Sequence, residues 1–213
     1  MPKGYWIVHI DVNNPEGYRD YLAATPAAHE KYHGVALVRA GAMEAIEGRA
    51  RSRNVLREFP DYATALACYR SDEYQRARPL RLAHAAADFV IIEGHDGIQP
   101  PPPPAPAAPP PPPAAPRKGY WIGHIDVTEP EGYKAYTIAD MAPFGQFGGR
   151  FLVRGGRREV VEGQVRGRTV VLEFPSYQAA LACYRSPDYQ AAKKFRDGRA
   201  ELDLVIVEGC DRA

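Results

Sequence analysis

The sequence predicts an α+β protein made of two ferredoxin-like domains, each with the order strand, helix, strand, strand, helix, strand. Two observations predict this fold class. Long stretches of the first half recur in the second half at a constant offset, and each half shows short apolar strands and two helical segments in that order. A four-stranded sheet of this kind has helices on one face only, so its other face needs a partner.

The internal repeat is defined by several matching segments. GYWIVHIDVNNPEGY begins at Gly4 and GYWIGHIDVTEPEGY begins at Gly119, an offset of 119 − 4 = 115. The same offset relates LVRAG to LVRGG, EFPDY to EFPSY, and the two copies of ALACYRS. No insertion is needed, and the period is too long for a solenoid repeat, so the halves are two copies of one domain.

A proline tract predicts the domain boundaries. Residues 100–116 contain only proline and alanine, which favours an extended polyproline II spacer with a reach of about 50 Å. We expect domains at 1–97 and 118–213, with a linker at 98–117. A spacer of this length permits the two copies to pair within one chain without requiring it. A proline tract can also bind a proline-recognition module, and that alternative stays open.

The first strand of each half predicts how the sheets pack. Within residues 5–12, Trp6 and Val8 lie on one face, and Tyr5 and His9 lie on the other. Both faces carry large side chains, so both should be buried, one by helices and one by a second sheet. We therefore expect two sheets packed face to face, either copy against copy within the chain or chain against chain.

The other elements of the first half follow in order, and the offset repeats them in the second. They are a helix from Pro15 towards Tyr32 with a kink at Pro26, strands at 36–40 and 54–59, a second helix capped by Asp61 that breaks near Ser71, and a strand at 89–93.

Composition excludes several classes of partner. The formal net charge is +1 and the pI is about 7.7, which does not favour nucleic acid or acidic lipid. Apolar runs are far too short to span a membrane, and no signal segment is evident. Cys68, Cys183 and Cys210 form an odd set without a C-x-x-C pair, which indicates reduced thiols. We expect a cytoplasmic protein.

One short motif has the spacing of a zinc site. His29, Glu30 and His33 match the H-E-x-x-H pattern, in which two histidines share one helix face. The offset aligns these three residues with Phe144, Gly145 and Gly148, so the motif occurs in one copy only. No third histidine follows at a suitable spacing. We therefore expect no dedicated metal site and no tightly held cofactor, and adventitious metal binding at most.

Three stretches of the second half resemble the domain of unknown function 1330 family, within the superfamily of dimeric α+β barrels. They are GGRFLVRGG at 148–156, VLEFPS at 171–176 and SPDYQ at 186–190. The first half is the more distant match, and both halves have cysteine, at Cys68 and Cys183, where the family commonly has tryptophan. The resemblance implies a barrel of two sheets with helices outside and a pocket between a sheet and its partner. It implies no particular reaction, although the wider superfamily includes cofactor-independent monooxygenases, isomerases, cyclases and haem-dependent enzymes.

Polar residues that recur in both copies at strand positions are the candidate catalytic groups. His9 and His124 lie mid-strand on the inward face, where a neutral imidazole can act as a base near neutral pH. They can equally be hydrogen-bonded within the interface between sheets. Arg39 and Arg154 end the second strand of each copy, where a guanidinium can clamp a carboxylate or enolate.

The third strand ends in an acid in each copy. Glu58 and Glu173 are further candidates for the catalytic set, or for a structural ion pair with the arginines above. Four tyrosines are candidate substrate-binding residues: Tyr5, Tyr120, Tyr74 and Tyr189. The last two can instead anchor a helix to the core. Cys68 and Cys183 lie among apolar residues and are expected to be inert.

Two functions follow from these residues. The first is a cofactor-independent small-molecule enzyme with a histidine and arginine pocket, acting by proton transfer or oxygenation on a carbonyl-bearing or cyclic apolar substrate. The alternative is a non-catalytic module for ligand binding or assembly, in which the same residues hold the barrel together. The expected partners are a small-molecule ligand and a second sheet face, from the same chain or another copy.

Overall fold

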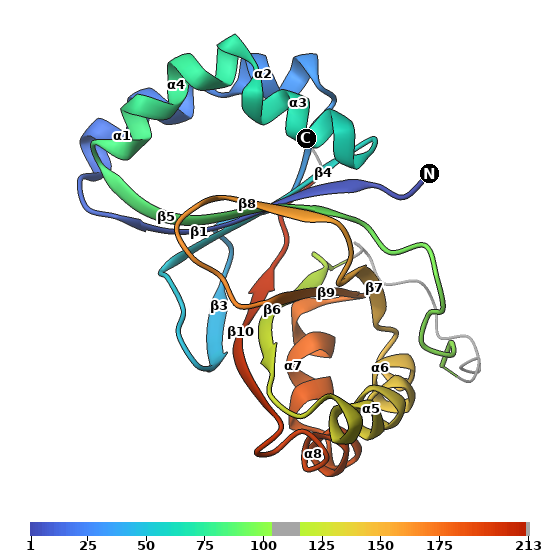
Figure 1. The fold of residues 1–213 in the computed structure, drawn as a ribbon. Coiled ribbons are helices and arrows are strands. Elements are labelled where there is room, and N and C mark those ends of the chain that lie inside the picture. The colour runs from blue at the N-terminus through green and yellow to red at the C-terminus, as the bar shows by residue number, and fades with distance from the viewer. Residues whose placement is uncertain (104–115, 212–213) are drawn as a thin grey trace.

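The computed structural model describes residues 1–103 and 116–211, which form two antiparallel sheets with helices on their outer faces (Figure 1). The first half contains β1 (Gly4–Val12), α1 (Pro15–Ala24), α2 (Pro26–Lys31), β2 (Val35–Arg39), β3 (Met43–Glu47), β4 (Arg53–Phe59), α3 (Tyr62–Arg70), α4 (Asp72–Leu82) and β5 (Ala85–Glu93). The second half contains β6 (Gly119–Val127), α5 (Pro130–Ala139), α6 (Met141–Gln146), β7 (Arg150–Arg154), β8 (Arg158–Glu162), β9 (Arg168–Phe174), α7 (Tyr177–Arg185), α8 (Pro187–Lys193) and β10 (Ala200–Glu208). The polyproline II conformation expected for the tract falls largely on residues 104–115, outside the described residues.

Serine caps divide the second helix of each half. Ser71 is extended, with a ψ of 151°, and its hydroxyl accepts a hydrogen bond from Tyr74 N at 3.3 Å. Ser186 makes the equivalent cap with Tyr189 N at 3.2 Å. Each cap satisfies a free N–H group at the start of a new helix. The predicted break of the second helix is therefore confirmed in both halves.

The two sheets exchange one strand each. Their strand orders are β2-β4-β1-β5-β8 and β3-β10-β6-β9-β7, so each sheet receives an edge strand from the other half. In Figure 1 the orange β8 lies along β5, and the blue β3 lies along β10. Each half thus contributes five strands, where the sequence predicted four. The extra strands, MEAIE and REVVE, carry charged residues and pair with strands of the opposite half. The sequence of one half alone therefore does not show what these segments pair with.

The face of β1 and β6 that carries the histidines lies between the sheets. Tyr5 and Ile7 belong to one buried cluster with Tyr120 and Ile122, which draws on both halves. The sheets therefore pack face to face within a single chain, which decides between the intrachain and interchain arrangements left open by the sequence.

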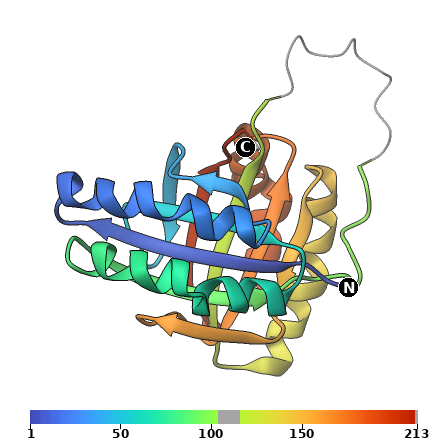
Figure 2. The same ribbon diagram turned by 90° about the horizontal axis from the view of Figure 1, so that it is seen from above.

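Helices cover the outer face of each sheet (Figure 2). Trp6 lies beneath the first helix layer and donates from Nε1 to the Ala65 carbonyl at 2.8 Å. Trp121 makes the same bond to the Ala180 carbonyl at 3.0 Å. Each tryptophan thus fixes a helix to its sheet through an apolar ring and one polar atom. No helix within residues 1–103 and 116–211 is long and apolar enough to cross a membrane.

An ion pair with a buried arginine attaches each exchanged strand to the half that receives it, through Arg81 of α4 in the first half and Arg196 after α8 in the second. Glu162 of β8 accepts two hydrogen bonds from the fully buried Arg81, at 2.6 and 2.7 Å. Glu47 of β3 accepts the equivalent two from Arg196, at 2.6 and 2.8 Å. Removing one partner of a buried ion pair typically costs about 3–5 kcal/mol, because the remaining charge is left without compensation.

Candidate functional site

The two predicted histidines contact each other between the sheets. The Nε2 atoms of His9 and His124 lie 2.8 Å apart. The other ring nitrogen of His9 is 2.5 Å from Asn54 Oδ1, and that of His124 is 3.1 Å from Thr169 Oγ1. Both histidines are buried, and burial lowers the pKa of each imidazole, so both are neutral at pH 7.

Their partners give the hydrogen-bond chain a direction. Asn54 Oδ1 can only accept, so the Nδ1 atom of His9 carries the proton. The Nε2 atom of a neutral His9 is then bare and accepts from His124 Nε2–H. The Nδ1 atom of His124 is in turn bare and accepts the Thr169 hydroxyl proton. The two histidines therefore hold opposite tautomers, although they occupy equivalent positions of the repeat.

The histidine pair lines an open cleft of about 970 Å³ that both halves form. Arg51 and Arg166, at equivalent places on its rim, are each held by aspartates of the same half. All four ring nitrogens of the histidines are already engaged, so no lone pair is left to accept a substrate proton. The geometry favours the interface role for these residues over the role of base.

The predicted tyrosine and glutamate pairs lie elsewhere in the space between the sheets. Tyr5 donates to Glu58 at 2.9 Å, and Tyr120 donates to Glu173 at 3.1 Å. Burial, followed by the charge of Glu58, raises the pKa of Tyr5, which keeps that phenol protonated. Each pair is a hydrogen bond across neighbouring strands, β1 to β4 and β6 to β9.

The predicted arginines form no ion pair with these acids within the described parts of the chain. Glu173 is paired instead with Lys118 at 2.6 Å and Arg150 at 3.1 Å. Arg39 is exposed on the first half. Arg154 points to the helix side of its sheet, where its guanidinium lies 4.5 Å from the centre of the Phe151 ring. A register shift in β7 between Phe151 and Val153 interrupts the alternation that would otherwise place Arg154 on the inward side with Leu152. The structural pairing suggested by the sequence is therefore wrong.

Tyr74 and Tyr189 are buried beneath the helices. Their hydroxyl groups lie 3.3 Å from the Tyr21 hydroxyl and 3.0 Å from the Tyr136 hydroxyl, respectively. Both contacts join one helix of the layer to another, which is the anchoring role that the sequence left open for them. Tyr189 also lines the cavity described below.

The zinc-like motif does not present two histidines on one helix face. His29 lies in α2 with its ring 5.5 Å from the ring of Trp6, and His33 follows the helix in a left-handed conformation with a φ of 55°. Burial lowers the pKa of His29 to about 3. Across residues 1–103 and 116–211, no three or more His, Cys, Asp or Glu side chains are grouped so that they could hold a metal ion.

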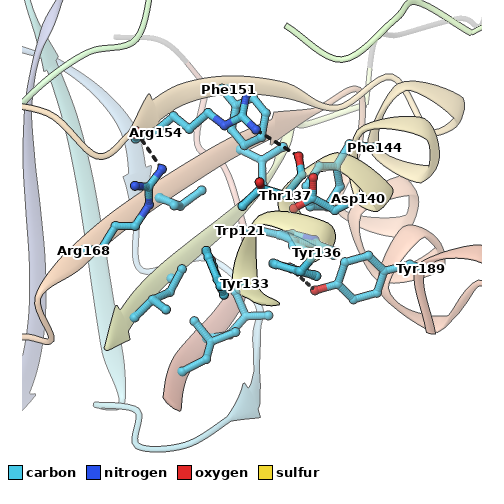
Figure 3. Close-up of a pocket in the computed structure, with 16 residues that line it drawn as sticks. Trp121, Tyr133, Tyr136, Thr137, Asp140, Phe144, Phe151, Arg154, Arg168 and Tyr189 are labelled. Carbon is cyan, nitrogen blue, oxygen red and sulfur yellow. Dashed lines mark hydrogen bonds between the residues drawn. The ribbon is translucent and has the colours of Figure 1, made fainter. Parts of the chain in front are cut away.

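A cavity with a buried carboxyl group lies in the second half, between helices α5 and α6 and the outer face of the second sheet (Figure 3). The space open to the centres of water molecules is about 40 Å³, and the cavity opens to solvent at its mouth. Its aromatic lining residues are Trp121, Tyr133, Tyr136, Phe144, Phe151 and Tyr189. Apolar walls with a few polar groups are typical of sites for small molecules.

Asp140 is the acid of this cavity. It is 5% exposed, and its Oδ1 atom has no hydrogen-bond partner among the described residues. Burial raises the pKa of the carboxyl group to about 7, against the opposing charges of Arg154, Arg196 and Arg168. An acid with this pKa is about half ionised at neutral pH and can accept a proton from a weakly acidic group.

The local chain geometry leaves the carboxyl group free. Asp140 ends α5, with its backbone N–H bonded to Tyr136 O at 2.9 Å, and its carbonyl accepts from Phe144 N at 3.1 Å as α6 begins. Its side chain makes no cap bond to α6. An aspartate at a helix start commonly caps the free N–H groups. Here the carboxyl group lines the cavity instead.

Two guanidinium groups lie on the strand side of the cavity. Arg154 donates to the Thr137 carbonyl at 3.2 Å and lies 4.5 Å from the centre of the Phe151 ring. Arg168 donates to the carbonyl of Arg154 at 3.2 Å. Figure 3 shows Arg154 reaching from its strand towards Thr137, beside Asp140. The cavity thus combines one proton acceptor with two cations able to stabilise a negatively charged oxygen.

The equivalent region of the first half is built differently. Thr25 stands at the position of Asp140, since 140 − 115 = 25. Val8 replaces Gly123, and Phe89 replaces Leu204 and packs its ring 5.0 Å from that of Trp6. Larger side chains therefore occupy the first half where the second half has space, and the acid is present in one copy only.

Sequence reasoning missed Asp140 because it looked for polar residues shared by both copies. The informative signal was a difference between the copies. The second half has a carboxyl group, Asp140, at the junction of two helices, and it has Gly123 on a strand that lines the same cavity, where the first half has Thr25 and Val8. Arg154 and Tyr189 are the two predicted residues that the structure brings to this cavity.

The fold defines a tandem α+β barrel, and comparison with known proteins gives its family. The model of the domain of unknown function 1330 (DUF1330) matches residues 3–95 and again residues 118–210. The chain belongs to this family and carries its domain twice, so the resemblance stated above is confirmed. No curated protein matches the chain.

Several solved structures share the fold over nearly the whole chain. An anthrone oxidase-like protein is 15% identical, with a TM-score of 0.57, over 100% of this chain and 92% of that one. A chlorite dismutase variant from Candidatus Nitrospira defluvii, in complex with cyanide, is 9% identical, with a TM-score of 0.52, over 98% and 91%. A Fusobacterium nucleatum protein provisionally assigned as a monooxygenase is 8% identical, with a TM-score of 0.52, over 100% and 94%. At these identities the likeness concerns the fold alone, and it confirms the predicted fold class.

Proposed function

We propose that the second half is the catalytic half of a cofactor-independent enzyme, in which Asp140 removes a proton from a cyclic, carbonyl-bearing apolar substrate. The observation that carries the proposal is a buried carboxyl group, with an oxygen that has no partner, lining a cavity walled by aromatic rings. A carboxyl group is costly to bury without hydrogen bonds, and such groups are commonly retained for function.

The reaction uses three groups of this cavity. The carboxylate of Asp140 takes a proton from a carbon next to the substrate carbonyl, and the C–H electron pair moves to form an enolate. Arg154 and Arg168 stabilise the negative charge on the enolate oxygen. Asp140, now protonated, returns the proton to the same or a conjugated carbon, which completes an exchange or an isomerisation without net oxidation.

The substrate class follows from the walls of the cavity and from its open mouth. Aromatic side chains favour a flat, apolar ring system, and the opening lets such a molecule place one edge beside Asp140 while the rest lies towards the mouth. The name of the anthrone oxidase-like protein that shares the fold refers to a ring ketone of this general kind. That likeness supports the choice of probe and nothing finer.

The test uses β-tetralone, a two-ring ketone with an activated C–H group. In deuterated buffer, the intact chain should accelerate the exchange of that hydrogen, followed by proton NMR. Asp140→Asn should reduce the acceleration by about 100-fold or more, because a positioned base contributes about 100- to 10,000-fold. Thr25→Ala, the matched change in the first half, should leave the rate unchanged.

The alternative, a ligand-binding module without catalysis, predicts a different result. In that case β-tetralone shifts the amide signals of cavity residues, while the exchange rate stays at the buffer background in the intact chain and in Asp140→Asn. If the intact chain accelerates exchange and Asp140→Asn does so equally, Asp140 is not the base.

A further inference from the structure

We propose that Glu47, a residue of the first half, is a positioning residue for Asp140 in the second half: it holds Arg196 in an ion pair and so keeps that guanidinium from pairing with the buried carboxyl group. The inference rests on the proposed role of Asp140 as a base. It assigns a role in the second-half site to a strand that the first half contributes.

The first step is the delivery of Glu47 across the interface. It lies on β3, which joins the second sheet by pairing with β10. Its carboxylate accepts both hydrogen bonds from Arg196 and a third from the Tyr184 hydroxyl at 2.9 Å. Lys193 lies 3.8 Å away. Every one of these partners belongs to the second half.

The second step is the position of Arg196 relative to the cavity. Arg196 is 3% exposed, and its guanidinium lies 5.2 Å from the centre of the Tyr136 ring, which lines the cavity. Tyr136 lies one helical turn before Asp140, so the two share a helix face. The Nη1 atom of Arg196 has no hydrogen-bond partner among the described residues, and neither has Asp140 Oδ1. Two buried groups of opposite charge near the same helix face thus remain unjoined.

The third step concerns the charges around Asp140. Arg154 on β7, Arg168 on β9 and Arg196 after α8 each oppose the rise in the carboxyl pKa that burial causes. Tyr133 and Tyr136 of α5 and Cys183 of α7 also interact with Asp140, and all three are neutral at pH 7 because burial raises their pKa values. Glu47 is the carboxylate that compensates Arg196. Without its charge, Arg196 exerts its full positive field and has an orphaned N–H group to direct at Asp140.

The first half provides a matched control. Glu162 of β8 binds Arg81 in the same geometry, and Arg81 lies 5.6 Å from the centre of the Tyr21 ring. Thr25 stands where the second half has Asp140. The same ion pair therefore exists in both halves, and only one of the two has an acid beside it.

The experiment measures the pKa of Asp140 by carbon-13 NMR of its carboxyl group in the intact chain, which needs no substrate. Glu47→Gln should lower that pKa by about one unit or more, because an uncompensated arginine beside an aspartate typically lowers it by about 1–3 units. Arg196→Met should raise it. Glu162→Gln, which breaks the equivalent ion pair, should leave it unchanged.

The opposite directions separate positioning from structural support. Glu47→Gln and Arg196→Met break the same ion pair, so a purely structural role would move the Asp140 pKa the same way in both or in neither. Either outcome would overturn the inference. If Glu47→Gln does not fold, Arg196→Met compared with Arg81→Met decides, since the inference requires a rise in the first and none in the second. Loss of β-tetralone exchange bears on the proposed function alone, because the NMR titration is independent of turnover.

Discussion

Gly123→Val is expected to stabilise the protein and to abolish the proposed proton exchange at the same time. Val8 occupies the equivalent position in the first half, where it is 5% exposed. A Cβ atom at position 123 would lie 3.2 Å from Leu202 Cδ1 and 3.7 Å from Leu204 Cδ1. The first contact is tight and the second is ordinary, so a shift of a few tenths of an ångström in one leucine side chain makes room for the new atom.

The magnitude follows from the atoms added. Valine places three carbons in the cavity, which stabilises by about 2.4 kcal/mol at about 0.8 kcal/mol per carbon. The greater strand preference of valine adds up to about 1 kcal/mol, and crowding against Leu202 opposes these gains by about 1–3 kcal/mol. The net gain is about 1 kcal/mol, or a rise in Tm of about 2–4 °C for a chain of this size.

The assay pairs thermal unfolding with β-tetralone exchange. Filling about 40 Å³ of free space leaves no room for a ring next to Asp140, so exchange should fall to the buffer background. The matched variant Val8→Gly should lose stability in the first half and keep full exchange. A Gly123→Val protein that unfolds at a higher temperature and still exchanges the probe would show that the cavity is not the site.

Two further expectations concern pH. The exchange rate should rise with pH through about 7, as Asp140 loses its proton, and the rise should be absent in Asp140→Asn; a rate that falls over this range would contradict the assignment. His9, His29 and His124 have lowered pKa values in the fold, so below about pH 6.5 the unfolded chain binds more protons than the folded one. In the Asp140→Asn background, which removes the opposing contribution of that carboxyl group, denaturant titrations should show the free energy of unfolding falling by up to about 4.1 kcal/mol per pH unit below 6.5, about 1.36 kcal/mol for each histidine. Stability that stays constant from pH 7 to 5.5 would mean that the histidines are charged in the fold.

Much of the fold could be predicted from the sequence because the repeat shows each pattern twice. The alternation around Trp6 and His9 correctly separates the helix-facing side of β1 from the side between the sheets. Ser71 and Ser186 mark the helix break through ordinary capping chemistry. The exchanged strands β3 and β8 were not predictable in this way, since their partners lie in the other half and their sequences mix charged and apolar residues evenly.

The candidate site was less predictable for a related reason. Polar residues shared by both copies include His9 and His124, which the structure joins in one hydrogen-bond chain. Asp140 is not shared, and its proposed role depends on its burial and on the empty space beside it. Neither property can be read from the residue itself, because a polar residue at a helix junction is usually a cap or a solvated group.

Joining the two copies in one chain also has a consequence for proton order. In a symmetric dimer of a single domain, both central histidines would have the same outer partner, and the proton between them would have two equivalent positions. Here Asn54 on one side and Thr169 on the other select a single arrangement. The difference between Asn54 and Thr169 thus removes a degeneracy that symmetry would impose, and the centre of this barrel has a polarity that no symmetric homodimer of either half could have.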